Sequence, residues 1–291
     1  MDPILVPLDE SPIAEDSIPW AAAIAKAQGR PVHLVTVRPS ADAYWEFADV
    51  DPRTSVEAHR QTLNDYLEQM RHSEALNGLT VSAEVLDGPI APQIRWLADR
   101  IRASLVVMTT RGRGGFGRPG VGSVAEKLVR TLRVPVVVVP PDVPYVPVES
   151  ILVPLDGSGE SERALAHARA LANDLGAALH LLHVIDPDTA WGLSDEEAGR
   201  FLDAMRGRAQ NYVEGVALAG EHAAVVEGRV PDAILDYAGD QGCRFITMTT
   251  HGRRPEPELE LGSTADALVR VIDRPVMLIT APPAEERAAE E

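Results

Sequence analysis

Residues 4–9 read ILVPLD, and residues 151–156 read ILVPLD again. A short apolar run that ends in an aspartate is typical of a buried strand followed by a turn. Further blocks recur in the same order: VHLVTV at 32–37 matches LHLLHV at 179–184, and MTTRG at 108–112 matches MTTHG at 248–252. Ordered repeats of this kind predict two homologous domains, residues 1–146 and 147–291. The proline-rich stretch PPDVPYVP at 140–147 is expected to join them as a semi-rigid linker.

Each copy alternates short apolar runs with stretches of helical periodicity. In the first copy we expect strands at 4–8, 32–37, 81–86, 105–109 and 134–139, and helices at 12–28, 54–76, 90–102 and 123–132. In the second we expect strands at 151–155, 179–184, 223–227, 245–249 and 275–280, and helices at 159–175, 195–219, 231–241 and 263–272. Alternation of this kind favours an α/β fold with a parallel sheet and helices on both of its faces. Ligands of such sheets bind beyond the carboxyl ends of the strands, where the winding reverses.

The composition excludes several classes of function. Lys and Arg total 27 against 44 Asp and Glu, a net charge of −17, so no general attraction for nucleic acid or anionic membranes is expected. The single cysteine, Cys243, excludes an intramolecular disulfide and a cysteine-based metal cluster. No apolar run reaches the roughly 18–20 residues of a membrane span, and residues 1–10 lack the features of a signal peptide. We therefore expect a cytoplasmic protein.

Two loops that follow strands carry the candidate site. The first is PLDES at 7–11, with its counterpart PLDGS at 154–158. Asp9 and Asp156 can accept hydrogen bonds from ribose or amino groups, or they can cap the helix that follows, and the sequence leaves both roles open.

The second loop, residues 109–123, reads TTRGRGGFGRPGVGS. Its glycines allow backbone N–H groups to approach a ligand closely, and Gly122-Ser123 opens a helix whose N-terminus attracts anions. Arg111, Arg113 and Arg118 add positive charge, so the loop predicts a phosphate site; a surface loop capped by the serine is the alternative. No GxxxxGK(S/T) motif occurs, and the GxGxxG string at 112–117 follows a fourth strand rather than a first, which argues against a dinucleotide-binding fold.

These residues resemble the motif of the universal stress protein family. Its nucleotide-binding members carry G-x2-G-x9-G-(S/T) after the fourth strand and an aspartate after the first. Gly112 followed by Gly122-Ser123, and Gly252 followed by Gly262-Ser263, match the later part of that motif, while Thr109 and Thr249 stand in place of its first glycine. The resemblance implies two tandem open five-stranded parallel sheets of order 3-2-1-4-5. It also implies that ATP or another adenine nucleotide binds, with or without Mg²⁺.

In that family the aspartate and its neighbours contact ribose and base, the end of the second strand contacts adenine, and the motif glycines and serine hold phosphates. The implied contacts are Pro7, Leu8, Asp9, Val37, Met108, Thr109, Arg111, Gly112, Arg113, Gly122, Ser123 and Val124 in the first copy, and Pro154, Asp156, Val184, Thr249, Gly252, Gly262, Ser263 and Thr264 in the second. We expect the first copy to bind nucleotide better, because residues 253–261 of the second read RRPEPELEL, in which prolines remove N–H donors and glutamates repel phosphate.

The sequence thus favours an ATP-binding stress-response or signalling module that acts through an unnamed protein partner. It predicts no catalytic residue and no metal ligand set; slow ATP hydrolysis or self-phosphorylation at Ser123 is the most that it allows. The rival interpretation is a scaffold without nucleotide, in which the two domains pair through residues 134–139 and 275–279; a homodimer is left open. His33 and His180 lie inside expected strands, and we interpret them as packed side chains.

Overall fold

The computed structural model describes residues 1–39, 52–110, 122–252 and 261–280, with the backbone alone for residues 52–56. The chain divides into two units, Met1–Tyr145 and Val146–Glu291, and each is described by itself.

The first unit is a parallel sheet with strand order β3-β2-β1-β4-β5. Its elements are β1 (Ile4–Leu8), α1 (Pro12–Glu15), α2 (Ser17–Gln28), β2 (Val32–Arg38), α3 (Pro52–Arg71), the 3₁₀ helix η3 (Glu74–Leu76), β3 (Val81–Asp87), α4 (Ile90–Arg100), β4 (Leu105–Thr109), α5 (Ser123–Thr131) and β5 (Val136–Val139). The order confirms the expected 3-2-1-4-5 arrangement. β1 lies at the centre, between β2 and β4, so the winding of the chain reverses beside it.

The second unit repeats this arrangement with strand order β8-β7-β6-β9-β10. Its elements are β6 (Ser150–Pro154), α6 (Gly159–Leu175), β7 (Ala178–Ile185), the 3₁₀ helix η4 (Pro187–Ala190), α7 (Asp195–Val216), β8 (His222–Glu227), α8 (Val230–Asp240), β9 (Phe245–Thr249), α9 (Ser263–Val271) and β10 (Val276–Ile279). The internal repeat of the sequence is therefore a repeat of the whole α/β unit.

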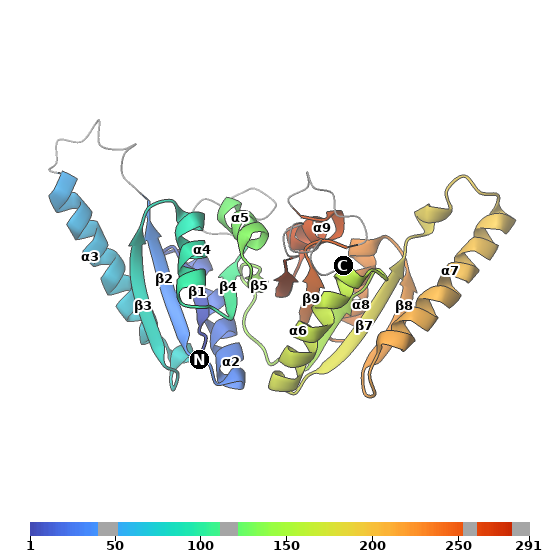
Figure 1. Cartoon of the computed structure of the whole chain (residues 1–291), viewed down its shortest axis with the longest axis horizontal. Helices are drawn as coiled ribbons and strands as arrows, with labels where there is room; N and C mark the ends of the chain where they lie inside the picture. Colours follow the sequence, from blue (N-terminus) through green and yellow to red (C-terminus); the bar gives the residue numbers. More distant parts are fainter. Residues whose placement is uncertain (40–51, 111–121, 253–260, 281–291) are drawn as a thin grey trace. The chain divides into compact units, whose positions relative to one another are not determined.

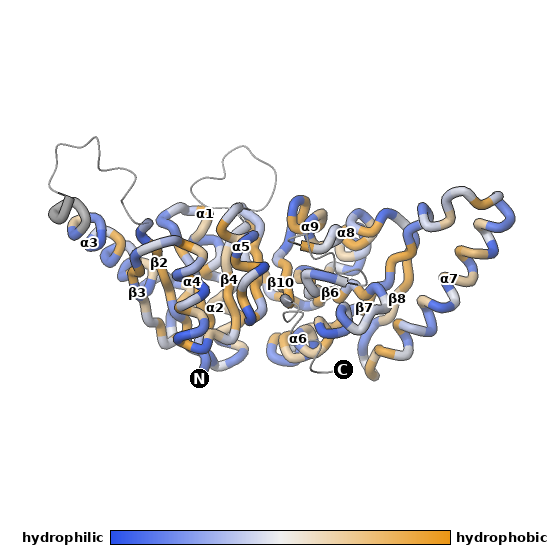
Figure 2. The backbone as a smooth tube through the Cα atoms, turned by 45° about the horizontal axis from the view of Figure 1, so that its top comes forward, coloured by the Kyte–Doolittle hydropathy of each residue, from blue (hydrophilic) through white to orange (hydrophobic). Residues whose placement is uncertain are grey.

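Helices cover both faces of the sheet in each unit, and the core lies between these layers (Figure 1). Figure 2 shows the hydrophobic residues concentrated along the strands, whereas the helices alternate hydrophobic and hydrophilic residues. The four residues of β5 and the five of β4 and β9 are all buried. Burial on both faces is the physical reason that these strands read as continuous apolar runs.

The first helix differs between the copies. The sequence predicts one helix over 12–28, but the structure divides it into α1 and α2 at Asp16. Pro19 explains the break, because a proline cannot donate to the carbonyl four residues earlier and its ring clashes with that carbonyl. The second copy has Ala166 at the corresponding position, and α6 runs unbroken over Gly159–Leu175, as predicted.

Part of the proline-rich stretch packs on the first unit. The indole Nε1 of Trp20, which is 1% exposed, donates to the carbonyl oxygen of Val143 at 3.3 Å. The ring of Tyr145 meets that of Trp20 edge-on, with 5.0 Å between ring centroids. Residues 143–145 thus belong to the first unit by contact.

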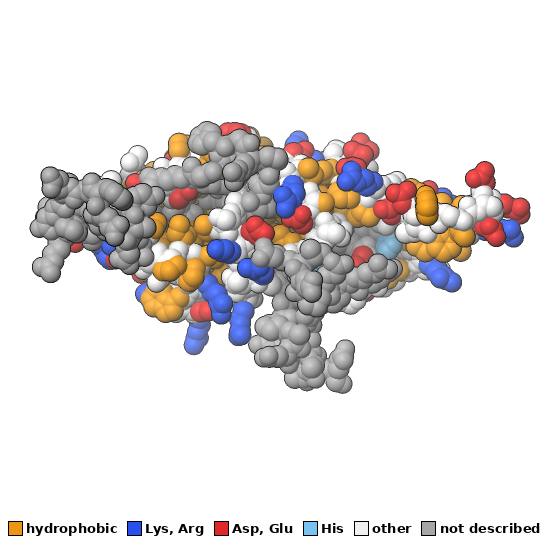
Figure 3. All heavy atoms as spheres, turned by 90° about the horizontal axis from the view of Figure 1, so that it is seen from above, with side chains coloured by type: hydrophobic (Ala, Val, Ile, Leu, Met, Phe, Trp, Pro, Cys, Tyr) orange, Lys and Arg blue, Asp and Glu red, His pale blue; other side chains and the backbone are white. Residues whose placement is uncertain are grey.

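Large apolar side chains are exposed near the start of α7. Trp191 is 90% exposed, and Leu193 and Phe201 are exposed as well. The first turn of α7 is acidic, with Asp195, Glu196 and Glu197. At the α7 end of the second unit, Figure 3 shows hydrophobic side chains beside acidic ones. Among the described residues, no helix is both long and apolar enough to cross a membrane.

Candidate functional site

The two candidate loops of each unit leave neighbouring parallel strands at the same edge of the sheet. β1 pairs with β4, and β6 pairs with β9. Since the carboxyl ends of parallel strands meet at one edge, this topology places the residues that directly follow the first strand next to those that directly follow the fourth.

In the turn after β1, Asp9 and Ser11 make different hydrogen bonds. Asp9 Oδ1 accepts hydrogen bonds from the backbone N–H of Ser11, at 3.1 Å, and from its hydroxyl. Ser11 Oγ in turn accepts from the N–H of Ala14 at 3.2 Å and is the N-cap of α1. The cap is therefore the serine, and the aspartate fixes the serine in place. This decides the question of the helix cap that the sequence left open.

The turn after β6 repeats the same arrangement. Asp156 Oδ1 accepts from Ser158 N at 2.9 Å and from its hydroxyl, and Ser158 Oγ accepts from Ser161 N at 3.1 Å. The residue between the aspartate and the serine has a positive φ in both copies: 63° at Glu10 and 83° at Gly157. A left-handed conformation is unfavourable for a residue with a Cβ, so only the second copy carries the residue that suits this turn.

The glycine before each last helix is hydrogen-bonded to the residue that directly follows the fourth strand of its unit. Gly122 N donates to Thr110 O at 2.6 Å, and Gly262 N donates to Thr250 O at 2.8 Å. A Cβ on Gly262 would lie 2.9 Å from Thr250 O, so the close approach of the two backbones requires a glycine there. The motif glycine thus fixes where the last helix begins relative to the sheet.

Both last helices begin after a glycine. Gly122 is the N-cap of α5 and Gly262 that of α9, and among the residues that the structure describes no side chain is hydrogen-bonded at either cap. Ser123 and Ser263 are exposed first residues of these helices rather than their caps. The serine cap that the sequence allowed as an alternative is therefore wrong. The N–H groups of the first helical turn remain suited to an anionic ligand.

In the second unit the two loops are in contact. A Cβ built on Gly252 would lie 2.3 Å from Asp156 Oδ2 and 3.2 Å from its Cγ, so the aspartate packs directly against the glycine backbone. The two motif residues are separated by 96 positions in the chain, and the fold brings them together. In the first copy, Arg111, Gly112 and Arg113 lie outside the described residues.

The apolar members of the candidate set are largely core residues. Leu8, Val37, Met108 and Thr109 are all at most 9% exposed, and Thr249 is 5% exposed. Pro7, Pro154 and Val184 are half-buried, as are Val124 and Thr264 in the last helices. Thr249 Oγ1 donates to His251 O at 2.6 Å, so this side chain is turned toward its own loop. The buried positions can reach a ligand mainly through their backbone.

Two tyrosines that we had not predicted stand near the aspartates. Burial and the Glu15 carboxylate, with Asp9 and Glu10 nearby, raise the pKa of Tyr66. Burial and Glu162, with Asp156 nearby, raise the pKa of Tyr212 to about 12. The repeat carries a signal for both, because Tyr-Leu-Glu at 66–68 matches Tyr-Val-Glu at 212–214.

Each unit is a doubly wound α/β domain, a class of domain whose ligands generally bind beyond the carboxyl ends of the strands, where the winding reverses. The model of the universal stress protein family matches residues 1–140 and again residues 147–280. The chain therefore belongs to the universal stress protein family and carries two copies of its domain.

Two relatives match nearly the whole chain. A universal stress protein of Mycobacterium tuberculosis is 27% identical over 96% of this chain and 95% of its own length. Another, of Mycolicibacterium smegmatis, is 29% identical over 95% of this chain and 96% of its own length. The crystal structure of a universal stress protein from Archaeoglobus fulgidus has the same fold, with a TM-score of 0.70 at 20% identity, over 95% of this chain and 97% of that one.

Proposed function

We propose that the first domain binds an adenine nucleotide, with ATP as the expected ligand, and that the chain acts in the cytoplasm as a stress-response or signalling module. The observation that carries this proposal is the start of α5: a glycine N-cap hydrogen-bonded to Thr110, which directly follows β4, and a first helical turn that no side chain of the described residues caps. Such a turn presents N–H donors and the positive end of a helix dipole, which suits phosphate.

The aspartate turns support the rest of the ligand. Asp9 lies at the carboxyl end of the central strand, held by the Ser11 hydrogen bonds, where a carboxylate can accept from ribose hydroxyls. Mg²⁺, if it accompanies ATP, is expected to be held mainly by the phosphates and water, as this ion commonly is.

We expect the second domain to bind more weakly. Residues 1–146 hold 15 basic and 18 acidic residues, whereas residues 147–291 hold 12 and 26. The glutamates at 256, 258 and 260 fall in the loop that would surround the phosphates, and like charges at short range oppose binding. The proposal therefore predicts about one strong site per chain.

Titration calorimetry with ATP·Mg²⁺ tests the proposal on Ser123→Glu, with Ser263→Glu as the matched control. Both serines are exposed at the first position of a helix, where an acidic residue stabilises the helix itself. A carboxylate about 4 Å from a phosphate charge costs about 1 kcal/mol in water and about 4 kcal/mol near a protein surface. We expect Ser123→Glu to weaken ATP binding at least fivefold and Ser263→Glu to leave the strong site unchanged.

Adenosine, which lacks phosphates, is the ligand control, and its affinity is expected to be the same in all three proteins. Absence of ATP binding by the wild type would refute the proposal in favour of the scaffold interpretation. Two equally strong sites would refute the assignment to the first domain. The pairing of the two domains through their fifth strands and the homodimer remain predictions.

A further inference from the structure

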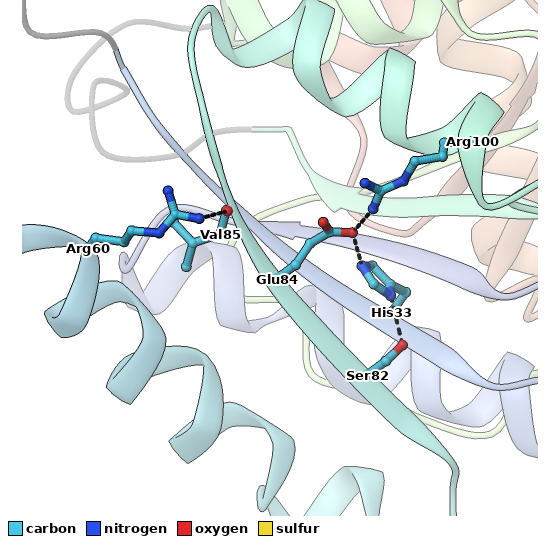
Figure 4. A network of polar contacts seen from close by, with 6 residues as sticks. All are labelled: His33, Arg60, Ser82, Glu84, Val85 and Arg100. Atoms are coloured by element: carbon cyan, nitrogen blue, oxygen red, sulfur yellow. Dashed lines mark hydrogen bonds and ion pairs between the residues drawn. The ribbon is translucent and has the colours of Figure 1, made fainter. Parts of the chain in front are cut away.

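A serine, a histidine and a glutamate form a hydrogen-bonded chain on the face of the first sheet that α4 covers. Ser82 on β3 is directly paired with His33 on the neighbouring strand β2. Glu84 lies two residues after Ser82 and so points to the same face of the sheet. Figure 4 shows the three side chains in line, with Arg100 of α4 above Glu84.

The partners of the two ring nitrogens of His33 indicate its tautomer. His33 Nδ1 lies 2.7 Å from Ser82 Oγ, and His33 Nε2 lies 3.0 Å from Glu84 Oε1. An ionised carboxylate only accepts hydrogen bonds, so Nε2 must carry the proton that is shared with Glu84. In the neutral ring Nδ1 is then an acceptor, and it faces the hydroxyl proton of Ser82.

The surroundings keep this chain in place and the histidine neutral. Burial lowers the pKa of His33, although Glu84 opposes that shift. Arg100 binds Glu84 and lies over the ring of Trp96 at 4.5 Å. From the other face of the sheet, Arg60 donates to the carbonyl of Val85 at 3.3 Å (Figure 4). Edge strand β3 is therefore held on both sides.

The three hydrogen-bonded side chains differ in solvent exposure in the way that an activated serine requires. The side chains of His33 and Glu84 are 11% and 25% exposed, whereas Ser82 is an exposed residue. The base and its orienting carboxylate are thus shielded, and the hydroxyl reaches solvent. A hydroxyl, a neutral imidazole that accepts its proton and a carboxylate that orients the imidazole are the components of an activated serine.

We propose that Ser82 is a nucleophile toward small activated carboxylic esters, with His33 as its general base and Glu84 as the positioning residue. Ser82 Oγ attacks the ester carbonyl carbon while its proton passes to His33 Nδ1. The bond from that carbon to the leaving alkoxide breaks, and His33 returns the proton to the alkoxide. Water, deprotonated by His33, then attacks the acyl carbon. The bond from that carbon to Ser82 Oγ breaks, His33 returns the proton to Oγ, and the carboxylic acid leaves.

The second copy lacks this chain at the same positions. His180 corresponds to His33, but His222 and Ala224 replace Ser82 and Glu84. The two histidine rings stack there at 4.6 Å between centroids, and His180 Nδ1 meets the hydroxyl of Tyr237 at 3.2 Å. The arrangement is therefore specific to the first domain and separate from the motif that both copies share.

A biotinylated fluorophosphonate probe tests the proposal, because an activated serine displaces fluoride from phosphorus and keeps the phosphonyl group. The full chain is labelled without nucleotide, and the modified residue is located by peptide mass spectrometry. Ser194 is the internal control: it is exposed, and its hydroxyl donates to Glu197 at 2.6 Å rather than to a histidine. We expect labelling of Ser82, none of Ser194, and parallel hydrolysis of p-nitrophenyl acetate.

The variants separate a chemical role from a structural one. His33→Gln is expected to slow labelling about 100-fold, within the range that general-base catalysis supplies. The labelling rate of the wild type should rise with pH through a single midpoint below 6.5, and Glu84→Gln should move that midpoint further down. Circular dichroism confirms that each variant is folded, and Ser82→Ala gives the background. Equal labelling of Ser82 and Ser194, or a rate that His33→Gln and pH leave unchanged, would overturn the proposal.

Discussion

Replacing Gly252 with alanine tests whether the two loops of the second unit depend on each other. The new Cβ would lie 2.3 Å from Asp156 Oδ2, where an ordinary contact needs about 3.4 Å, so the carboxylate must move by about 1 Å. That carboxylate is tethered, because its Oδ1 accepts from Ser158 N and from the Ser158 hydroxyl. Its movement loosens Ser158, the N-cap of α6.

The expected loss of stability follows from the hydrogen bonds that the substitution disturbs. Each hydrogen bond contributes about 0.5–1.5 kcal/mol, and an N-cap contributes about 1 kcal/mol. Since the displaced groups relax in part, we expect Gly252→Ala to destabilise the second unit by about 1–2 kcal/mol. Urea unfolding followed by hydrogen exchange of peptides from α6 measures this loss in the unit concerned, and faster exchange is expected in the first turn of the helix.

A double-mutant cycle with Asp156→Ala isolates the contact. Once the carboxylate is gone, alanine at 252 has nothing to displace, so the two effects should fall short of additive by about 1 kcal/mol or more. Gly199→Ala is the control: it lies in α7 with open space around its Cβ, and a gain of about 0.5–1 kcal/mol is expected there. Additive effects, or a Gly252→Ala protein as stable as the wild type, would refute the reasoning.

Three further substitutions test the local differences between the copies. Glu10→Gly should stabilise the first unit by about 1 kcal/mol in urea unfolding, because it removes a left-handed residue with a Cβ; a loss of stability would contradict this. Ala166→Pro should cost the second unit about 3 kcal/mol, although proline at the corresponding position 19 is tolerated; fast exchange throughout α6 is the readout, and an unchanged α6 is the contrary result. Burial and His222 lower the pKa of His180 in the folded unit. As the pH falls through 6.5, this histidine is therefore protonated in the unfolded chain before it is protonated in the folded unit. The free energy of unfolding should therefore fall as the pH drops below 6.5, by at most about 1.4 kcal/mol per pH unit. With the value at pH 7.5 as the reference, this fall should be smaller in His180→Gln.

Much of the candidate site was visible in the sequence because it depends on local chemistry. Aspartate followed two residues later by serine predicts a capped turn. The glycines predict a close approach of backbone N–H groups to a ligand, and the structure shows in addition that Gly262 lies close to the backbone of Thr250. Which residue caps the helix was not predictable, since Asp9 and Ser11 are both good caps. The structure assigns the cap to Ser11, because Asp9 is already bound to it. The loop at 111–121, with its arginines, stays a prediction.

The sequence by itself determined the repeat and the alternation of strands and helices, because burial on two faces and the amphipathic pattern of helices are properties of neighbouring residues. The strand order was expected only from the resemblance to a known family, and the structure confirms it. The tertiary structure alone decided which distant side chains meet. Two sets of contacts depend on strand register and on the packing of helices over the sheet: that of Asp156 with Gly252, and that of Ser82 and Glu84 with His33. A contact between residues that are far apart in the sequence produces no periodic pattern in it, so the contact can be identified only from the assembled sheet.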